Sequence, residues 1–240
     1  MEKKIRISIE IDEIIRNKWM QFDKLYVQEF DEDGVPEQPY VFDYFKEYKW
    51  NNGVETIQVM KDDIPEELSP QDYQINDNGE SNADPFLFKT EQKEYTAKEQ
   101  YEKFMYEDFT FEIFGAAPQM YRGIDLHMNE FIKKYKNVDI SIVSKENIYT
   151  IPPTLFFLSK AMCRFKTYKF YNEFNQYWDD CDILITTNPE LLENIPEGKV
   201  VIKLNRPYNK NIKSEYEYIQ LYDLIKDDKF NKLIENYGCK

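Results

Sequence analysis

Residues 138–144, VDISIVS, form an apolar run bounded by Asn137 and Lys145. A short apolar run between polar residues is typical of a strand that is buried on both faces of a parallel sheet. Two further runs of this kind follow along the chain, CDILITT at residues 181–187 and GKVVIKLN at residues 198–205. We therefore predict that this part of the chain supplies parallel strands to the core of an α/β domain.

Helix-forming segments alternate with these strands. The segment PPTLFFLSKAMCRF, residues 152–165, places prolines in a first helical turn, where proline is tolerated. ELLENI, residues 190–195, predicts a short helix, and the amphipathic ending at residues 222–238 predicts another. Because strands that alternate with helices across short connections form parallel sheets, the pattern predicts a three-layer, Rossmann-like α/β fold.

The N-terminal segment has the same character. KIRISIEID, residues 4–12, alternates polar and apolar side chains and is rich in isoleucine, which predicts a strand. Residues 14–30 repeat apolar positions at three- and four-residue steps and predict a helix directly after that strand. A similar helical pattern covers residues 119–137. We therefore predict a core domain made from residues 1–30 and 117–240.

The intervening residues 31–116 differ in composition. Between residues 55 and 108 the sequence has 15 acidic residues against 5 lysines. ETIQVM, residues 55–60, predicts a short strand, and residues 98–115 predict a helix closed by Gly115 in a left-handed cap. We predict that residues 31–116 form a cap-like, loop-rich insertion that is acidic and rich in aromatic residues.

Composition argues against several classes of protein. The formal net charge of −14 and the isoelectric point near 4.7 oppose binding to phosphate backbones, so we expect no direct contact with nucleic acid. No window approaches the roughly 18 apolar residues of a membrane span, and the N-terminus lacks the apolar stretch of a signal peptide. The three cysteines form no CxxC pair, which argues against a disulfide framework and favours a reducing compartment.

Several common active sites cannot be assembled from this sequence. His127 is the only histidine, so neither a Ser-His-Asp triad nor a histidine-based zinc site is available. We expect His127 on the surface or in packing. The glycine-rich phosphate-binding patterns GxxxxGK[ST] and GxGxxG are absent as well.

Candidate functional residues lie where the predicted strands end, because ligands in open α/β sheets bind at the carboxyl ends of the strands. The first strand ends in Glu10-Ile11-Asp12, and the second ends in Ser144-Lys145. The third ends in Thr186-Thr187-Asn188.

This order of motifs resembles the haloacid-dehalogenase superfamily, and within it the branch related to 5'(3')-deoxyribonucleotidases. The first strand of that family carries Asp-x-Asp, which Glu10-Ile11-Asp12 matches in spacing, and its second ends in Ser or Thr, as at Ser144. Residues 180–211 are similar to the strand, acidic pair, short helix, strand and Pro-Tyr-Asn turn of the branch. The resemblance covers both core segments and implies a phosphatase core, with residues 31–116 at the position of a cap.

The chain departs from the family at the positions that carry the chemistry. The family nucleophile is the first aspartate, which forms an aspartyl-phosphate, and here that position is Glu10. The extra methylene moves the attacking oxygen by roughly 1 Å, and misplacement of that order can cost about a hundredfold in rate. Thr186 and Thr187 replace the acidic pair that helps to hold magnesium, and neutral hydroxyls are weaker ligands for a hard dication. The family lysine would fall near Gln176, and the nearest lysine upstream is Lys169.

Simpler interpretations of the same residues stay open. Glu10 and Asp12 are also compatible with a solvated strand end, and Ser144 is compatible with a cap for the segment that follows.

We predict a catalytically degenerate protein of this family that acts as a structural or interaction subunit, with no cofactor and no metal. Its partners would be other proteins in a homo- or hetero-oligomer. The abundance of Lys, Asn, Ile and Tyr is typical of an AT-rich genome such as that of a bacteriophage. A large assembly such as a virion, or the cytoplasm of the producing cell, is therefore the expected location.

Two alternatives follow from the same resemblance. In the first, the chain is a magnesium-dependent nucleotidase in which nearby acids complete the metal site with Glu10 and Asp12; the candidate acids are Asp179, Asp180 and Glu190. In the second, it binds a nucleotide or phosphate without hydrolysing it, through Ser144, Lys145 and Asn188.

Overall fold

The computed structural model describes residues 4–30, 48–50, 54–60, 88–162 and 164–238. For residues 54–60, 88–92 and 237–238 it describes the backbone alone. The chain divides into two compact units, one comprising Met1–Lys49 with Glu102–Lys240 and the other comprising Trp50–Tyr101.

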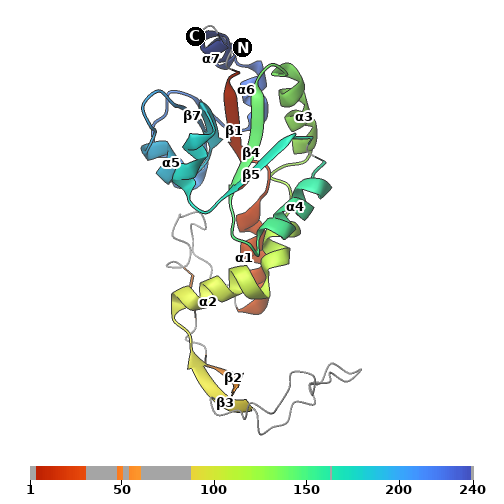
Figure 1. Ribbon diagram of the computed structural model, residues 1–240, viewed down its shortest axis with the longest axis vertical. Helices are drawn as coiled ribbons and strands as arrows, with labels where there is room; N and C mark the ends of the chain where they lie inside the picture. Colours follow the sequence, from red (N-terminus) through yellow and green to blue (C-terminus); the bar gives the residue numbers. More distant parts are fainter. Residues whose placement is uncertain (1–3, 31–47, 51–53, 61–87, 163, 239–240) are drawn as a thin grey trace, which may run out of the picture. The chain divides into compact units, whose positions relative to one another are not determined.

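The larger unit is built on a six-stranded sheet in which every neighbouring pair is parallel (Figure 1). The strand order is β5-β4-β1-β6-β7-β8. The strands are β1 (Arg6–Glu10), β4 (Asp139–Lys145), β5 (Thr167–Tyr171), β6 (Ile183–Thr186), β7 (Val200–Leu204) and β8 (Glu217–Tyr218). The predicted α/β fold with a parallel sheet is confirmed.

The strand order reverses beside the first strand. From β1 the chain adds β4 and β5 on one side, and it then returns to add β6, β7 and β8 on the other. The point between β1 and β6 is therefore a topological switch point, where the connections leave in opposite directions. In open α/β sheets, ligands bind at the carboxyl ends of the strands beside such a point. Glu10 ends β1 and Thr186 ends β6, so both residues lie at this switch point.

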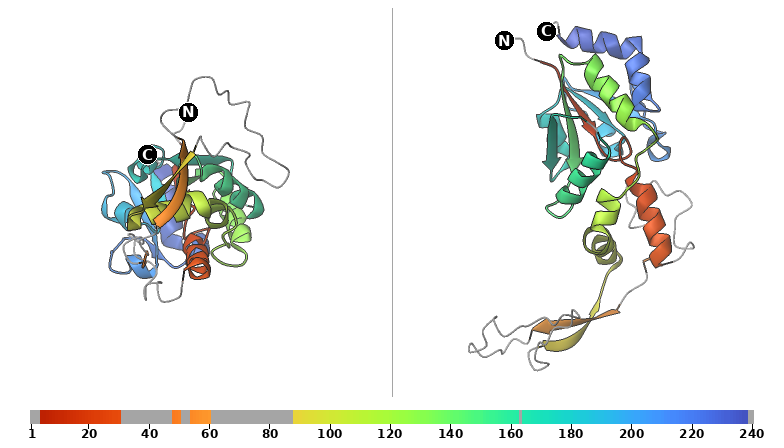
Figure 2. Two further views of the ribbon diagram at one scale, coloured as in Figure 1. Left: turned by 90° about the horizontal axis from the view of Figure 1, so that it is seen from below. Right: turned by 90° about the vertical axis from the view of Figure 1, so that its right-hand side faces the viewer.

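Helices pack on both faces of the sheet (Figures 1 and 2). The α-helices of this unit are α1 (Lys18–Glu29), α3 (Ile124–Lys134), α4 (Ile151–Lys160), α5 (Pro189–Glu193), α6 (Leu221–Lys226) and α7 (Asp228–Gly238). Tighter or wider turns are η4 (Phe104–Asp108), η5 (Phe111–Gly115), η6 (Phe174–Asp179) and η7 (Pro207–Asn209). Local sequence sets several of the helix starts: the Asn17 side chain accepts from the backbone N–H of Met20 at 3.2 Å, and prolines open α4 and α5.

Alternate residues of the central strands belong to two different hydrophobic clusters, one on each face of the sheet. Ile183 and Ile185 of β6 belong to the larger cluster, which α3, α4, α6 and α7 cover, whereas Leu184 belongs to a second cluster with Tyr177 and Leu191. Burial of one large aliphatic side chain contributes about 1.5–3 kcal/mol. The strands are therefore held from both faces, as the continuous apolar runs predicted.

Several predicted helices need correction. The helix predicted over residues 119–137 spans only Ile124–Lys134, and the helix predicted over residues 152–165 ends at Lys160. The helix predicted from residue 14 begins at Lys18, because residues 11–17 form a compact turn. The helix predicted over residues 222–238 is two helices, separated at Asp227, whose extended backbone (ψ 123°) stops α6. The helix predicted over residues 98–115 is divided among α2 (Ala97–Lys103), η4 and η5.

Glycine is needed at position 115 for a different reason than the predicted left-handed cap. It ends η5 without a positive φ, and a side chain there would place its Cβ 3.2 Å from the Cβ of Pro153. Glycine therefore permits close packing of η5 on the start of α4.

The smaller unit contains an antiparallel pair, β2 (Val54–Met60) and β3 (Phe88–Glu94). The strand predicted at residues 55–60 is confirmed, whereas β3, with the polar sequence FKTEQKE, was not predicted. The predicted boundaries of the insertion, residues 31–116, stay a prediction, since much of that stretch lies outside the described residues. Within the described part of the chain, no helix combines the length and apolar character needed to cross a membrane.

Candidate functional site

Glu10 is buried at the switch point between β1 and β6. The hydroxyl of Thr186 donates a hydrogen bond to Glu10 Oε2, so the ends of the two strands are joined through their side chains. Thr186 Oγ1 also accepts from the backbone N–H of Asn188 at 3.0 Å. Burial raises the pKa of Glu10 to about 7, because removal from water disfavours the charged form.

Asp12 is bound on both oxygens by cations of the same chain. Arg16 Nε lies 2.7 Å from Oδ1, and Lys18 Nζ lies 2.5 Å from Oδ2. Burial alone would raise the pKa of Asp12, but the charges and hydrogen bonds of Arg16 and Lys18 outweigh it and lower the pKa to about 2. Asp12 is therefore an anion at neutral pH, and both of its oxygens are engaged.

Arg16 connects Asp12 to a second buried carboxylate. Its Nη2 donates to Glu146 Oε1 at 2.9 Å, and its Nη1 donates to Thr154 Oγ1 at 2.7 Å and to the carbonyl of Phe114 at 2.9 Å. The side chains of Arg16 and Glu146 are both fully buried. Every nitrogen of the guanidinium thus has a partner inside the fold, which a charge in such a place requires.

Glu146 also accepts hydrogen bonds from the hydroxyl groups around it. Its Oε1 accepts from Ser144 at 2.8 Å and from Thr154 at 2.9 Å, in addition to Arg16. In the structure the Ser144 hydroxyl therefore donates to Glu146, two residues later in the chain. Glu146 was not among the predicted site residues.

Three buried polar atoms near the strand ends have no hydrogen-bond partner among the described residues. They are Glu146 Oε2, the hydroxyl of Tyr177 and Nδ2 of Asn188. Burial, together with the charges of Glu10, Asp12 and Glu146, raises the pKa of Tyr177 well above its usual range, so this hydroxyl stays protonated. Buried polar atoms in native proteins normally have partners, so each of these atoms could accept or donate to a water or a small ligand.

A further buried acid, Glu13, follows directly after Asp12. Its backbone adopts φ 59°, which is unfavourable for a residue with a side chain. Arg206 holds this conformation, since its Nε donates to the Glu13 carbonyl at 3.0 Å and its Nη2 donates to the same oxygen. Burial raises the pKa of Glu13 to about 7.

The two other predicted phosphate contacts, Lys145 and Asn188, and the predicted degenerate metal position Thr187 each make contacts within the fold, although Nδ2 of Asn188 has no partner among the described residues. Lys145 Nζ lies 3.3 Å from Glu173 Oε2 in an exposed ion pair. Asn188 uses Oδ1 to cap α5, where it accepts from the backbone N–H of Glu190 at 2.9 Å. Thr187 Oγ1 accepts from the hydroxyl of Tyr208 at 2.7 Å.

The positions considered for the family lysine lie outside this cluster. Gln176 Oε1 accepts from the backbone N–H groups of Asn172 and Glu173, which fixes the start of η6. Lys169 of β5 forms an ion pair with Asp180 at 3.2 Å.

The acids that an alternative metal site would need are not gathered at the strand ends. Asp180 pairs with Lys169, and the Asp179 carbonyl accepts at 3.3 Å from Arg6, which begins β1 and so lies at the opposite end of that strand from Glu10. Glu190 is exposed on α5.

The described residues do not fit a divalent cation. Both oxygens of Asp12 contact Arg16 and Lys18, and Thr186 donates its proton to Glu10. Over the part of the chain that the structure describes, no three His, Cys, Asp or Glu side chains converge as metal ligands.

Arg16, Lys18 and Glu146 are the residues that the sequence analysis missed. The apolar periodicity of residues 14–30 predicted a helix and gave no sign that Arg16 and Lys18 are directed to buried carboxylates. One signal was available: Arg16 follows Asp12 by four residues, the spacing at which opposite charges often pair.

The fold and these contacts together define a Rossmann-like α/β protein in which Arg16 and Lys18 neutralise Asp12 and Glu146 beside the strand ends, while Glu10 is held by Thr186. No protein-family model matches the chain, and no curated protein sequence matches it significantly.

Proposed function

We propose that the chain is a catalytically degenerate, haloacid-dehalogenase-like protein that acts as a structural or interaction subunit. One observation carries the proposal: Arg16 and Lys18 contact both oxygens of Asp12. In a phosphatase of the type that the sequence resembles, the corresponding carboxylate would be available to the metal and the substrate.

Charge balance supports this proposal. Asp12 and Glu146 carry two negative charges, and Arg16 and Lys18 carry two positive charges, so the cluster is neutral without a metal ion. Two unit charges 4 Å apart interact by about 4 kcal/mol at the effective dielectric constant of a protein surface. A dication placed beside Arg16 and Lys18 would be repelled by roughly twice that energy from each of them.

The state of Glu10 supports the same conclusion. With a pKa of about 7 it is half protonated at neutral pH, and a hydrogen bond from Thr186 holds one of its oxygens. A nucleophilic carboxylate needs a charged, free oxygen directed at the substrate. Glu10 therefore suits a structural contact between β1 and β6 better than attack on phosphorus.

The test is hydrolysis of p-nitrophenyl phosphate and of nucleoside monophosphates with Mg²⁺ present. We expect no turnover above the buffer rate. Asp12→Asn is the matched control, because residual activity from a contaminating phosphatase would persist in that variant. Turnover by the purified chain that disappears in Asp12→Asn would refute the proposal.

A non-hydrolysing binding module is the second candidate. The observation that favours it is the set of unpartnered buried atoms on Glu146, Tyr177 and Asn188. A ligand that binds only the folded chain raises its melting temperature. We would screen inorganic phosphate and nucleotides by thermal shift, with Asn188→Ala as the control; a shift that is lost in Asn188→Ala would favour this candidate, and no shift with any compound would remove it.

The proposal also includes the partners of the chain and its location. Other proteins remain the proposed partners, and a large assembly such as a phage virion is the proposed location, on the composition of the sequence alone.

A further inference from the structure

A groove of about 740 Å³ lies between η6 and α5. Its lining residues come from these two elements and from the chain that connects α5 to β7. Sites for small molecules commonly have volumes of roughly 300–1,000 Å³, with a few polar groups that converge on one apolar space. The groove has the size of such a site, so the chemistry of its lining decides what it can bind.

Two elements contribute a carboxylate to the groove. Asp179 ends η6, and Glu190 lies in the first turn of α5. Arg6 reaches only the backbone carbonyl of Asp179, and Asn194 reaches only that of Glu190. Among the described residues, neither carboxylate takes part in an ion pair or a hydrogen bond. Both carboxylates are therefore available as acceptors.

Amide and ammonium groups line the same groove. Asn175 on η6 makes no side-chain hydrogen bond within the described ranges, and its amide can both donate and accept. Asn194 uses Nδ2 on a backbone carbonyl of α5 at 2.9 Å and keeps its Oδ1. Lys199 donates to the carbonyl of Cys181 at 2.5 Å and lies 4.0 Å from Asp182 Oδ1, so it makes one short hydrogen bond out of a possible three. Donors and acceptors thus occur together.

Trp178 gives the groove an apolar wall with one polar atom. It is 6% exposed and belongs to the second hydrophobic cluster, and Leu191 and Pro196 line the groove with it. The indole N–H of Trp178 has no acceptor within the part of the chain that the structure describes, although buried indole N–H groups usually have one. A ligand that places an oxygen against this wall would supply that acceptor.

This lining matches a ring that carries several hydroxyl groups. An anion would be repelled by the two carboxylates, and a simple cation would leave the ammonium, amide and indole N–H groups without acceptors. A hydroxyl group both donates and accepts, so a few hydroxyls on one ring satisfy both kinds of partner. The C–H face of the same ring can pack on the apolar side chains of Trp178 and Leu191.

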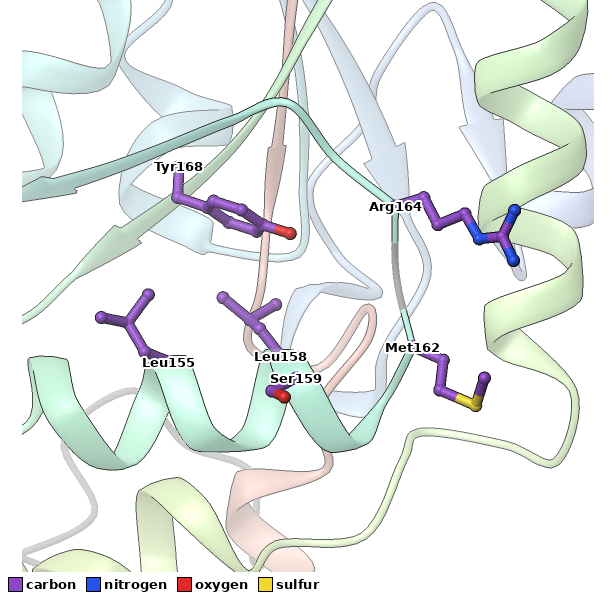
Figure 3. A pocket seen from close by; sticks show the side chains of 6 residues that line it. All are labelled: Leu155, Leu158, Ser159, Met162, Arg164 and Tyr168. Atoms are coloured by element: carbon purple, nitrogen blue, oxygen red, sulfur yellow. The ribbon is translucent and has the colours of Figure 1, made fainter.

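The groove beside α4 lacks this combination. It has a volume of about 370 Å³, and Leu155 and Leu158 point from α4 towards the ring of Tyr168 (Figure 3). Its polar lining residues are Ser159 and Arg164, and Arg164 extends away from Tyr168. None of the described residues that line it is an acid. The α4 groove therefore serves as a comparison site on the same molecule.

We propose that the groove between η6 and α5 binds a carbohydrate, whose hydroxyl groups bond to Asn175, Asp179 and Glu190 and whose ring packs on Trp178. This binding goes beyond the proposed role as an interaction subunit, and it does not depend on the state of the strand-end acids. Most of the polar lining residues are exposed, so the dissociation constant for a single sugar ring should be on the order of 1 mM.

The experiment is titration of the ¹⁵N-labelled full chain with the methyl glycosides of glucose, mannose, galactose and N-acetylglucosamine, followed by ¹H–¹⁵N NMR. The chain has three tryptophans, and the indole N–H resonance of Trp178, assigned by its loss in Trp178→Phe, reports on the groove. Trp19 and Trp50 supply the internal controls. We expect at least one glycoside to shift the Trp178 resonance saturably and to leave the other two unchanged.

Substitutions then connect the binding to the lining. Asn175→Ala and Glu190→Gln each remove one polar partner at an exposed position, so the fold should be retained. The matched controls are Asn172→Ala and Glu193→Gln, which change exposed residues of the same types outside the lining, and Leu155→Ala, which changes the α4 groove. We expect a dissociation constant at least about fivefold weaker in each lining variant and unchanged in the three controls.

Three results would overturn the proposal. The first is that no glycoside shifts the Trp178 resonance saturably up to about 50 mM. The second is that lining variants and controls weaken the binding equally. Arginine amide and inorganic phosphate are the competing probes: if one of them shifts this resonance and no glycoside does, the groove binds a charged group and not a carbohydrate.

Discussion

Replacement of Glu10 by glutamine should change how the stability of the fold depends on pH. The pKa of Glu10 is about 7 in the folded chain, against 4.5 for the free side chain. A raised pKa in the folded state means that its stabilising effect is complete below about pH 4.5 and is lost as the pH rises through 7. Glutamine keeps the acceptor for Thr186 but cannot ionise.

The magnitude follows from the shift. The shift from 4.5 to about 7 corresponds to about 3 kcal/mol, most of which falls between pH 5 and pH 8. Urea unfolding followed by circular dichroism at pH 5, 6, 7 and 8 gives the free energy of unfolding of both proteins. Relative to wild type, Glu10→Gln should become more stable by about 2 to 3 kcal/mol from pH 5 to pH 8.

The difference in free energy of unfolding between the two proteins at pH 5 is the internal control, because at that pH it reports mainly the structural effect of the substitution. A difference between the two proteins that is constant over this pH range would show that Glu10 is not a buried, uncompensated acid, and the description of the switch point would be wrong.

Three further substitutions test other parts of the structure by chemical denaturation. Arg16→Met should lower the free energy of unfolding by about 3–5 kcal/mol, because it leaves Glu146 buried without its cation; a loss below about 1 kcal/mol would contradict the buried network. Gly115→Ala should cost about 1–3 kcal/mol, since the new Cβ would meet Pro153 at 3.2 Å, and an unchanged stability would mean that η5 packs more loosely on α4. Asn17→Ala should cost about 1 kcal/mol by removing the cap of α1, whereas Asn17→Asp should retain most of the stability.

The sequence predicted the sheet where burial leaves a simple pattern. β4, β6 and β7 are covered on both faces, so their central residues are mostly apolar and the strands were readily identified. β5, with the sequence TYKFY, is an edge strand whose five residues are all half-buried. An edge strand needs no continuous apolar run, and for that reason β5 was not predicted.

The candidate site was predictable only in part. The carboxyl ends of parallel strands meet at one edge, so Glu10, Ser144 and Thr186 could be placed near one another from the strand pattern. Arg16 could not, because its neighbours have helical periodicity and only the compact turn at residues 11–17 directs it inward. The charge balance of the site depends on that turn. From the sequence alone, the strand ends were predicted to be too neutral to hold a metal, whereas in the structure Asp12 is paired with cations of the same chain.

The position of β1 has a consequence for how the chain is made. This central strand precedes both of its neighbours in the sequence: Ser8 meets a partner on β4 133 residues later, and Glu10 meets a partner on β6 176 residues later. Contacts that are so distant in sequence form slowly, and until β6 has been synthesised one edge of β1 has no neighbour. During that interval the nascent chain would need protection from pairing with other polypeptides, and a product truncated before residue 183 would retain an exposed central strand.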